Sequence, residues 1–186
     1  MEITETKLPA LFLVTPKRFE DERGFFSESW NQKILSEAGL DLPVFVQDNH
    51  SLSREIGTLR GLHFQSPPHA QGKLVRCGQG ELFDVAVDIR KGSPTFGDWF
   101  GTVLSAENGR QLWMPTGFLH GFVTLGPDTE ILYKCTDHYA PECDGAVHWD
   151  SLGIDWGVEK PLLSEKDAAA PSFADFDSPF TWKPTA

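Results

Sequence analysis

The chain has 186 residues, of which 40% are hydrophobic, enough for one domain spanning residues 1–186 to bury a core. Its 27 acidic and 16 basic residues give a formal net charge of −11, which argues against a nucleic acid or an anionic membrane surface as partner. There is no signal-peptide pattern and no apolar run long enough to span a bilayer, so we expect a cytoplasmic protein.

The composition favours an all-β fold. The chain contains 14 Phe, 6 Trp, 17 Gly and 13 Pro, and aromatic residues are favoured on half-buried pleated surfaces. Turn signals recur about every 8–12 residues in the middle of the chain, a spacing typical of a sandwich or barrel. The three cysteines show no CxxC spacing, which fits a reducing compartment and indicates no zinc site.

The first 51 residues predict strands and one short helix. Apolar residues 11–14 predict a strand at a sheet edge, and a charged turn ending at Gly24 leads into another strand. Residues 31–38 predict a short helix that Gly39 ends. Residues 44–51 read as a strand whose polar end is a candidate for facing a cavity.

The stretch from Gly57 to Arg76 gathers cationic side chains within apolar and turn-forming residues. Two short β-like runs are separated by consecutive prolines, so the stretch predicts a hairpin, with Arg60 and His63 on the first run and Lys73 on the second. Burying cations is costly unless polar or anionic groups meet them. We therefore interpret the stretch as part of a site.

The spacing of Arg60 and His63 raises a geometric difficulty. In a regular strand these residues point to opposite faces. Both can serve one site only if Arg60 lies at the rim of the barrel or if a bulge near Gly61 redirects the chain.

The strand expected at residues 81–90 alternates cleanly. One face carries Phe83, Val85, Val87 and Ile89, and the other carries Asp84, Ala86 and Asp88. The remaining expected elements are strands at 99–104, 111–114, 118–123 and 130–135, and a capped helical turn at 164–170.

Two segments resemble the paired motifs of cupins, which are jelly rolls of the double-stranded β-helix type. They are His63-x-Gln65 followed by Lys73, and Pro115-x-Gly117-x-x-His120. Many cupins hold a divalent metal through histidines and a glutamate. Here Gln65 replaces the second histidine and the ammonium of Lys73 would repel a cation, so we expect no metal.

The polar residues of these segments also suit proton transfer. Either histidine alone fits a core residue satisfied by a backbone group. Together, His63 can act as a general base near neutral pH, and Lys73 can stabilise a developing oxyanion. Tyr133 is a candidate acid for the other side of an inverted carbon, although a lone strand tyrosine is usually structural.

Nine fragments, from about Leu13 to Asp175, together resemble the dTDP-4-dehydrorhamnose 3,5-epimerase family. They include Asp21-x-Arg23-Gly24-x-Phe26-x-Glu28, Gln47-Asp48-Asn49, Gly57-Thr58-Leu59-Arg60-Gly61-Leu62-His63, Gln71-x-Lys73-Leu74-Val75-Arg76, Tyr133-Lys134 and Leu163-Ser164-Glu165-Lys166-Asp167. The resemblance implies a cupin-type jelly roll with a few short helices, an N-terminal strand extension and a short C-terminal helical tail.

The resemblance also implies an activity. A metal-free homodimer without a cofactor would epimerise dTDP-4-dehydro-6-deoxy-glucose at carbons 3 and 5. By family analogy His63 removes each proton while Asp167 pairs with its other ring nitrogen. Lys73, helped by His120, would meet the enolate oxygen, and Tyr133 would return a proton to carbon 5 from the opposite face.

Further positions match residues that bind the substrate in the family. Arg60 and Arg23 match positions at the diphosphate, and the partner subunit is one possible source of Arg23. The others, near the nucleotide or sugar, are Glu28, Gln47, Asn49, Tyr139 and Lys166. The chain departs from the family at two positions after Tyr-Ala-Pro, with Asp144 for a glutamate and Gly145 for an arginine; Asp144 would keep an acceptor with a shorter reach.

Three alternatives stay open. A related cupin could act at a single carbon, or as a ketoisomerase, on the same class of nucleotide sugar, and Tyr133 favours the carbon 5 epimerase among these. A metal-dependent cupin is disfavoured by Gln65 and Lys73. A non-catalytic sugar-binding jelly roll would have no need for both His63 and Tyr133.

Overall fold

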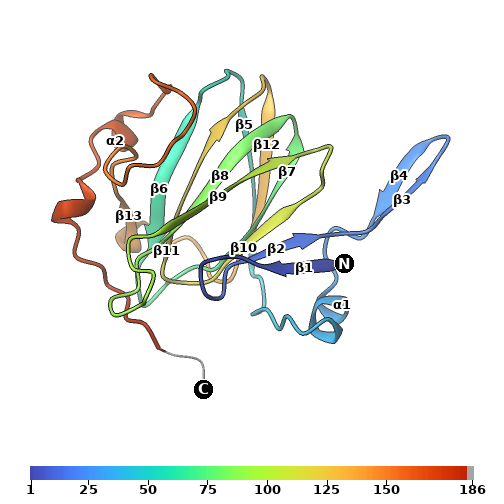
Figure 1. Cartoon of the computed structure of the whole chain (residues 1–186), viewed down its shortest axis with the longest axis horizontal. Helices are drawn as coiled ribbons and strands as arrows, with labels where there is room; N and C mark the ends of the chain where they lie inside the picture. The colour runs from blue at the N-terminus through green and yellow to red at the C-terminus, as the bar shows by residue number, and fades with distance from the viewer. Residues whose placement is uncertain (184–186) are drawn as a thin grey trace.

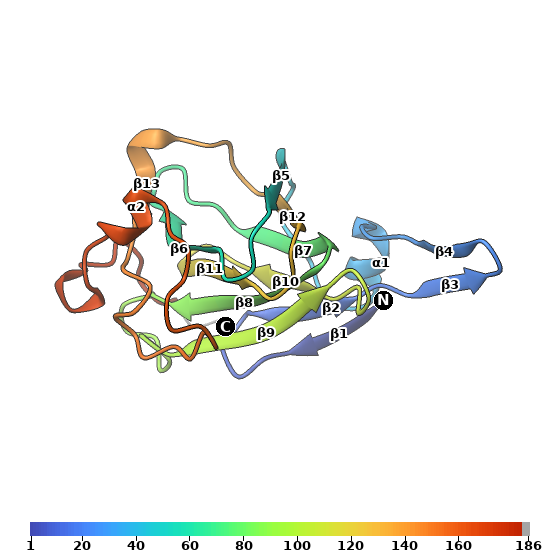
Figure 2. The same ribbon diagram turned by 90° about the horizontal axis from the view of Figure 1, so that it is seen from above.

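Two antiparallel sheets lie against each other in the computed structural model, which describes residues 1–183 (Figure 1, Figure 2). The six-stranded sheet has the order β1 (Glu2–Glu5), β2 (Phe12–Thr15), β10 (Gln111–Met114), β7 (Lys73–Gln79), β12 (Thr129–Cys135) and β5 (Gln47–Ser53). The five-stranded sheet has the order β13 (Asp144–Ala146), β6 (Leu59–Gln65), β11 (Phe118–Thr124), β8 (Glu81–Asp88) and β9 (Trp99–Ser105). The arrangement confirms the prediction of an all-β, cupin-type jelly roll.

The main core lies between the two sheets, and β8 shows how the sequence builds it. Leu82 and Ala86 belong to the cluster that joins both sheets, whereas Val85 and Val87 belong to a second cluster on the other face of the five-stranded sheet. The predicted alternation of β8 is therefore confirmed. Successive side chains of a strand point to opposite faces of the sheet, and both faces of β8 are buried.

The segments outside the sheets cover the outer faces. Val147, Ile154 and Trp156, in the C-terminal part of the chain, pack on the five-stranded sheet, and Figure 1 shows this part running alongside β6 and β13. Its short helices are η1 (Pro141–Cys143), α2 (Glu165–Ala168) and η2 (Phe173–Asp175). Helix α1 (Gln32–Glu37) brings Leu35 to Trp113 on the six-stranded sheet. Within residues 1–183, the helices are too short to cross a membrane.

Both helix predictions are confirmed. The side chain of Asn31 caps the start of α1 and Gly39 follows its end with a φ of 88°, a backbone conformation that glycine adopts at little cost. The hydroxyl of Ser164 accepts a hydrogen bond from the backbone N–H of Asp167 and so caps α2.

The prediction of a hairpin between Gly57 and Arg76 is wrong. Its two runs form β6 and β7, but these strands belong to different sheets. Strand β6 pairs with β11 and β13, and β7 pairs with β10 and β12. The connection containing Pro67 and Pro68 crosses from one sheet to the other instead of folding the chain back. His63 and Lys73 consequently come from facing sheets.

Two other expectations need correction. The strand at residues 12–15 is not at an edge, because β1 covers its outer side. Strand β1 has the sequence Glu-Ile-Thr-Glu, which offers one strongly apolar residue and little signal. The strand expected at 44–51 begins later, at Gln47, and runs to Ser53.

A hairpin formed by β3 (Arg18–Asp21) and β4 (Gly24–Ser27) projects away from the two sheets, as both views show (Figure 1, Figure 2). It carries the exposed aromatic side chains of Phe19, Phe25 and Phe26.

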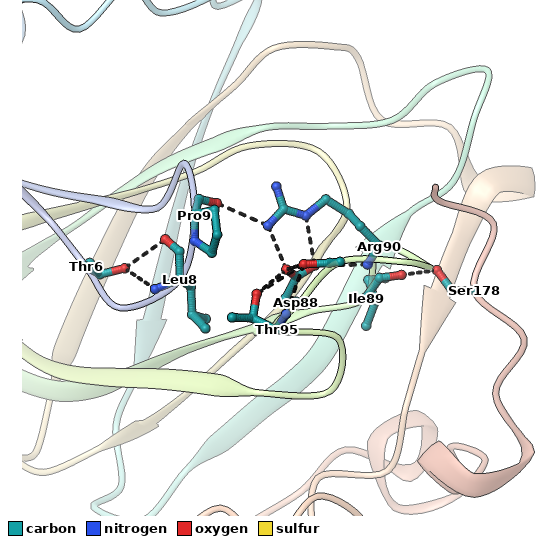
Figure 3. A network of polar contacts seen from close by, with 9 residues as sticks. Thr6, Leu8, Pro9, Asp88, Ile89, Arg90, Thr95 and Ser178 are labelled. Carbon is teal, nitrogen blue, oxygen red and sulfur yellow. Dashed lines mark hydrogen bonds and ion pairs between the residues drawn. The ribbon is translucent and has the colours of Figure 1, made fainter. Parts of the chain in front are cut away.

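A buried ion pair joins both termini to the end of β8 (Figure 3). The carboxylate of Asp88 accepts hydrogen bonds from Arg90, Ser93 and Thr95, and the guanidinium of Arg90 also donates to the carbonyl of Pro9 at 3.1 Å. The same guanidinium lies 4.3 Å from the ring centroid of Trp182. Charged groups inside a protein need such partners, and this network links the segments at Pro9 and Trp182 to the end of β8.

Candidate active site

A cavity of about 560 Å³ lies between the sheets and the segment that leads into α2. A second cavity of about 360 Å³ adjoins it and shares four lining residues, His63, Lys73, Tyr133 and Lys166. The larger cavity is also lined by Ser51, Thr58, Leu59, Arg60, His120, Phe122, Ile131, Leu162, Leu163, Ser164 and Asp167. All five residues predicted to be catalytic therefore line one space.

His63 is paired with a buried aspartate. Its Nε2 lies 2.5 Å from Oδ1 of Asp167, whose residue is 3% exposed. Burial alone would raise the pKa of Asp167, but the hydrogen bond and charge of His63 outweigh it and leave the pKa below its ordinary value. An ionised Asp167 accepts the Nε2 proton, so Nδ1 of His63 is left with a free lone pair.

His120 forms a second pair of this kind. It lies directly opposite His63 in the β6–β11 ladder, and its Nε2 is 2.7 Å from Oδ1 of Asp84. Asp84 is completely buried, and its Oδ2 has no hydrogen-bond partner within residues 1–183. The alternation of residues 81–90 predicted Asp84 on the face opposite Phe83, Val85 and Val87, but Asp84 was not assigned to the site. The available signal was the pair of carboxylates, Asp84 and Asp88, on one face of a strand.

Lys73 and Tyr133 come from the six-stranded sheet and face these histidines. The ammonium of Lys73 lies 5.9 Å from the ring centroid of Tyr133. Desolvation lowers the pKa of Lys73, against the opposing effects of Cys135, Asp144 and Asp84. Desolvation likewise raises the pKa of Tyr133, so its hydroxyl stays protonated at neutral pH. The cavity thus holds a protonated phenol opposite an imidazole with a free nitrogen.

A bulge brings Arg60 to the same cavity as His63. His120 pairs with His63 and Phe122 pairs with Arg60, so β6 has one more residue than β11 between these pairs. Gly61 lies within this bulge and has a φ of 132°. A Cβ at this position would lie 2.5 Å from the Cα of Gly121, so the bulge requires a glycine here. The bulge anticipated near Gly61 is confirmed.

Arg60 is exposed, so it also lies at the rim of the cavity. Its guanidinium donates to the hydroxyl of Ser53 at 3.2 Å and to the carbonyl of Leu52 at 3.4 Å. Over the described part of the chain no carboxylate forms an ion pair with it. Its charge is therefore available to an anionic ligand.

The second cavity holds the residues expected near the nucleotide or sugar. Gln47 donates to Oδ1 of Asn49 at 3.0 Å and accepts from the backbone N–H of Tyr139 at 2.9 Å. Asp144 and Lys166 form an ion pair beside them. Tyr139 is 57% exposed and lines this cavity, so it remains accessible to a ligand.

The glycine at position 145 has a steric explanation. A Cβ at Gly145 would lie 2.4 Å from Cζ of Phe64, on the neighbouring strand β6. An arginine at this position would require Phe64 to move.

Two predicted binding residues lie outside both cavities of this chain. Arg23, with a 90% exposed side chain, is paired with Asp21 at the end of the β3–β4 hairpin. Glu28 accepts a hydrogen bond from Asn31 and lines a groove with Leu74 and Arg76. Because Leu74 and Arg76 alternate with Lys73 and Val75, this groove lies on the other face of the six-stranded sheet.

The histidines do not form a cupin metal set. Within residues 1–183 there is no group of three or more His, Cys, Asp and Glu side chains that could hold a metal ion. His63 and His120 are instead each paired with an aspartate.

Comparison with known proteins identifies the family of the chain. The family model described as dTDP-4-dehydrorhamnose 3,5-epimerase matches residues 5–175. The chain belongs to this family. A relative named dTDP-4-dehydrorhamnose 3,5-epimerase from Salmonella typhimurium is 56% identical over 174 residues, covering 92% of this chain and 94% of the relative.

Solved structures share the fold over nearly the whole chain. A dTDP-6-deoxy-D-glucose-3,5-epimerase from Legionella pneumophila, in complex with dTDP-4-keto-L-rhamnose, has a TM-score of 0.92 and 48% identity, covering 98% of this chain and 99% of that one. A 3'-monoepimerase from Streptomyces bikiniensis, in complex with dTDP-quinovose, has a TM-score of 0.84 and 34% identity, covering 91% and 86%. The fold is therefore common to enzymes that act at two carbons and at one.

Proposed function

We propose that this protein epimerises dTDP-4-dehydro-6-deoxy-D-glucose at carbons 3 and 5 to give dTDP-4-dehydro-L-rhamnose, a step of dTDP-L-rhamnose biosynthesis. The observation that carries the proposal is the position of His63 and Tyr133, which come from facing sheets and line one cavity. Membership of the epimerase family and the ligand of the Legionella enzyme support the choice of substrate.

The reaction is two proton exchanges through an enolate. The ketone at carbon 4 acidifies the C–H bonds at carbons 3 and 5. Nδ1 of His63 takes the proton, Asp167 holds the ring through Nε2, and the electron pair of the broken C–H bond moves onto the ketone oxygen. A proton then returns to the same carbon on the opposite face. No electrons are gained or lost overall, so we expect the reaction to need neither metal nor redox cofactor.

The groups around the cavity suit the charge that develops. The ammonium of Lys73 stabilises the enolate oxygen, and a preorganised charge of this kind contributes several kcal/mol in a dry site. His120, whose ring is held by Asp84, lines the same cavity. Tyr133 supplies the returning proton at carbon 5, because burial keeps its hydroxyl protonated. The spent His63 and Tyr133 are restored by proton exchange with water.

The rim of the cavities suits a nucleoside diphosphate. Arg60 presents a guanidinium to the diphosphate, and arginine can donate two parallel hydrogen bonds to phosphate oxygens. Gln47, Asn49 and Tyr139 provide amide groups and an exposed ring for the nucleotide or sugar. Lys166 adds a second cation in that cavity, where it is paired with Asp144.

A homodimer would complete the site. Arg23 and Glu28 match binding positions but lie outside this chain's own cavities. The projecting β3–β4 hairpin carries exposed Phe19, Phe25 and Phe26, a surface that favours contact with another protein surface. We propose that this hairpin lies against a second copy of the chain and delivers Arg23 to the partner's cavity.

We expect the protein in the cytoplasm, without nucleic acid or a membrane as partner. Three buried, unpaired cysteines suit the reducing cytoplasm. The net charge of −11 disfavours nucleic acid and anionic membranes as partners.

An isotope experiment separates this function from its closest alternative, a single-centre epimerase. The protein is incubated with dTDP-4-dehydro-6-deoxy-D-glucose in heavy water, and deuterium entry is followed by NMR. We expect deuterium at both carbons, with dTDP-4-dehydro-L-rhamnose as product. Deuterium at one carbon only would support the single-centre enzyme, and none at either would reject catalysis.

A further inference from the structure

Helix α2 is tied to the sheet by two consecutive side chains. Asp167 pairs with His63 on β6, and Lys166 pairs with Asp144 at the start of β13. Strand β13 is the edge neighbour of β6, with Ala146 opposite His63 and Asp144 opposite Gln65. The two ion pairs therefore link the same short helix to two adjacent strands, one of them through the general base itself.

The second tie matters because α2 has little stability of its own. The helix spans four residues, Glu165–Ala168, and one turn is not stable in isolation. Its cap from Ser164 is local, whereas the Asp144–Lys166 ion pair anchors it to the sheet. Since neighbouring residues of a single turn cannot move independently, the position of Lys166 also constrains Asp167.

Lys166 is the residue shared by the two cavities on the α2 side. It lines both the cavity that holds Arg60 and the cavity that holds Tyr139, whereas Asp144 lines only the latter. An anionic ligand that enters either cavity competes with Asp144 for the ammonium of Lys166. The hydrogen bond to Asp144 raises the pKa of Lys166, so the ammonium remains a cation throughout the neutral range.

We propose that Asp144 is a positioning residue that acts through Lys166: the Asp144–Lys166 ion pair holds α2 so that Asp167 orients His63, and it competes with the ligand's diphosphate for Lys166. This inference rests on the proposed function and adds a residue that contacts no reacting atom. Removing the carboxylate has two opposite effects. It frees Lys166 for the diphosphate, and it loosens the helix that carries Asp167.

The test uses Asp144→Asn in the full chain. At saturating dTDP-4-dehydro-6-deoxy-D-glucose we expect the rate of deuterium entry to fall about tenfold, because small misplacements of a catalytic group are costly. The dissociation constant for dTDP, measured by calorimetry, should fall about threefold, the value of an exposed ion pair. Asp144→Glu, which restores a carboxylate, should return both values to those of the wild type. Glu165→Gln, an exposed neighbour on α2 with no ion pair in the described structure, is the matched control and should change neither.

Several results would overturn the inference. Weaker binding of dTDP by Asp144→Asn would show that Asp144 binds the ligand directly, and an unchanged exchange rate would show that it does not position the base. If Asp144→Asn does not fold, Lys166→Gln must slow exchange by a similar factor, and normal exchange in that variant contradicts the role of the ion pair. Absence of exchange in the wild type would count against the proposed function alone, because the dTDP measurement still decides the competition for Lys166.

Discussion

His63 and Lys73 lie close together in sequence but on facing sheets, and both line the two adjoining cavities. The connection between β6 and β7 places a candidate base on one wall and a candidate oxyanion partner on the other. Strand β12, next to β7, adds Tyr133 to the second wall. His63 and Tyr133 consequently line the same cavity from opposite sheets.

Replacing His63 by asparagine should abolish proton removal at both carbons. Asparagine keeps a polar side chain but has no basic nitrogen, and a general base contributes about 10²–10⁴ in rate. Deuterium entry in heavy water measures the loss. Entry at one carbon with the wild-type rate would mean that another group serves as the base there.

Replacing Tyr133 by phenylalanine should separate proton removal from correct reprotonation. The ring still fills the cavity, and His63 still exchanges the proton, but the opposite face lacks a donor. We expect deuterium entry to persist while formation of the carbon 5 epimer falls by at least about 10². The two quantities come from one NMR time course. Equal loss of both would instead assign Tyr133 to the first step.

The decrease of activity at alkaline pH, the alkaline limb of the pH profile, should depend on the ionisation of Lys73. Burial lowers the pKa of Lys73 below its ordinary value of 10.5, whereas burial raises that of Tyr133 above 10.0. As pH rises, the ammonium of Lys73 should lose its proton below pH 10.5, and the maximal rate should fall with it. In Lys73→Arg the guanidinium stays protonated, so this limb should move upward even if the variant is slower. An identical limb in both proteins would exclude Lys73 as its source.

The Asp88–Arg90 pair should contribute to stability rather than to chemistry. Asp88 is fully buried and Arg90 is 8% exposed, so Asp88→Asn leaves an uncompensated cation and should lower the free energy of unfolding by about 3 kcal/mol. Urea unfolding measures the change. Asp177→Asn removes the partner of Lys91 in an exposed pair and serves as control, with an expected cost below about 1 kcal/mol. An equal loss of unfolding free energy in the two variants would show that burial of the Asp88–Arg90 pair does not increase its contribution to stability.

The same pair predicts the direction of an acid effect. Burial raises the pKa of Asp88, but hydrogen bonds from Arg90, Ser93 and Thr95 outweigh it and leave the pKa below 3.8. A carboxyl group whose pKa is lower in the folded state stabilises that state at pH values above its pKa in the unfolded chain. This stabilisation is lost as the pH falls through the pKa of the folded state. The stability of Asp88→Asn should consequently depend less on pH in the acid range than that of the wild type.

The sequence predicted the elements better than their partners. The alternation of β8 and the caps of α1 and α2 depend on neighbouring residues, so they could be read from the chain. The assignment of β6 and β7 to different sheets depends on pairing with β11, β10 and β12, which are far away in sequence. The hairpin prediction failed for this reason.

The candidate site shows the same division. His63, Lys73, His120 and Tyr133 were identified from residue type and resemblance, and the structure brings them to one cavity. Asp84 was missed because its partnership with His120 arises from the pairing of β8 with β11. Arg23 and Glu28 lie outside both cavities of this chain, so their predicted binding role depends on the proposed contact with a second copy of the chain.

The most direct test of the account is a crystal structure of the protein with dTDP-glucose, a ligand without the ketone. We predict that the sugar ring lies between Nδ1 of His63 and the hydroxyl of Tyr133, with these atoms on opposite faces of the ring and the diphosphate at Arg60. A ligand with both atoms on the same face of the sugar, or one bound in the groove at Glu28 instead, would contradict the account.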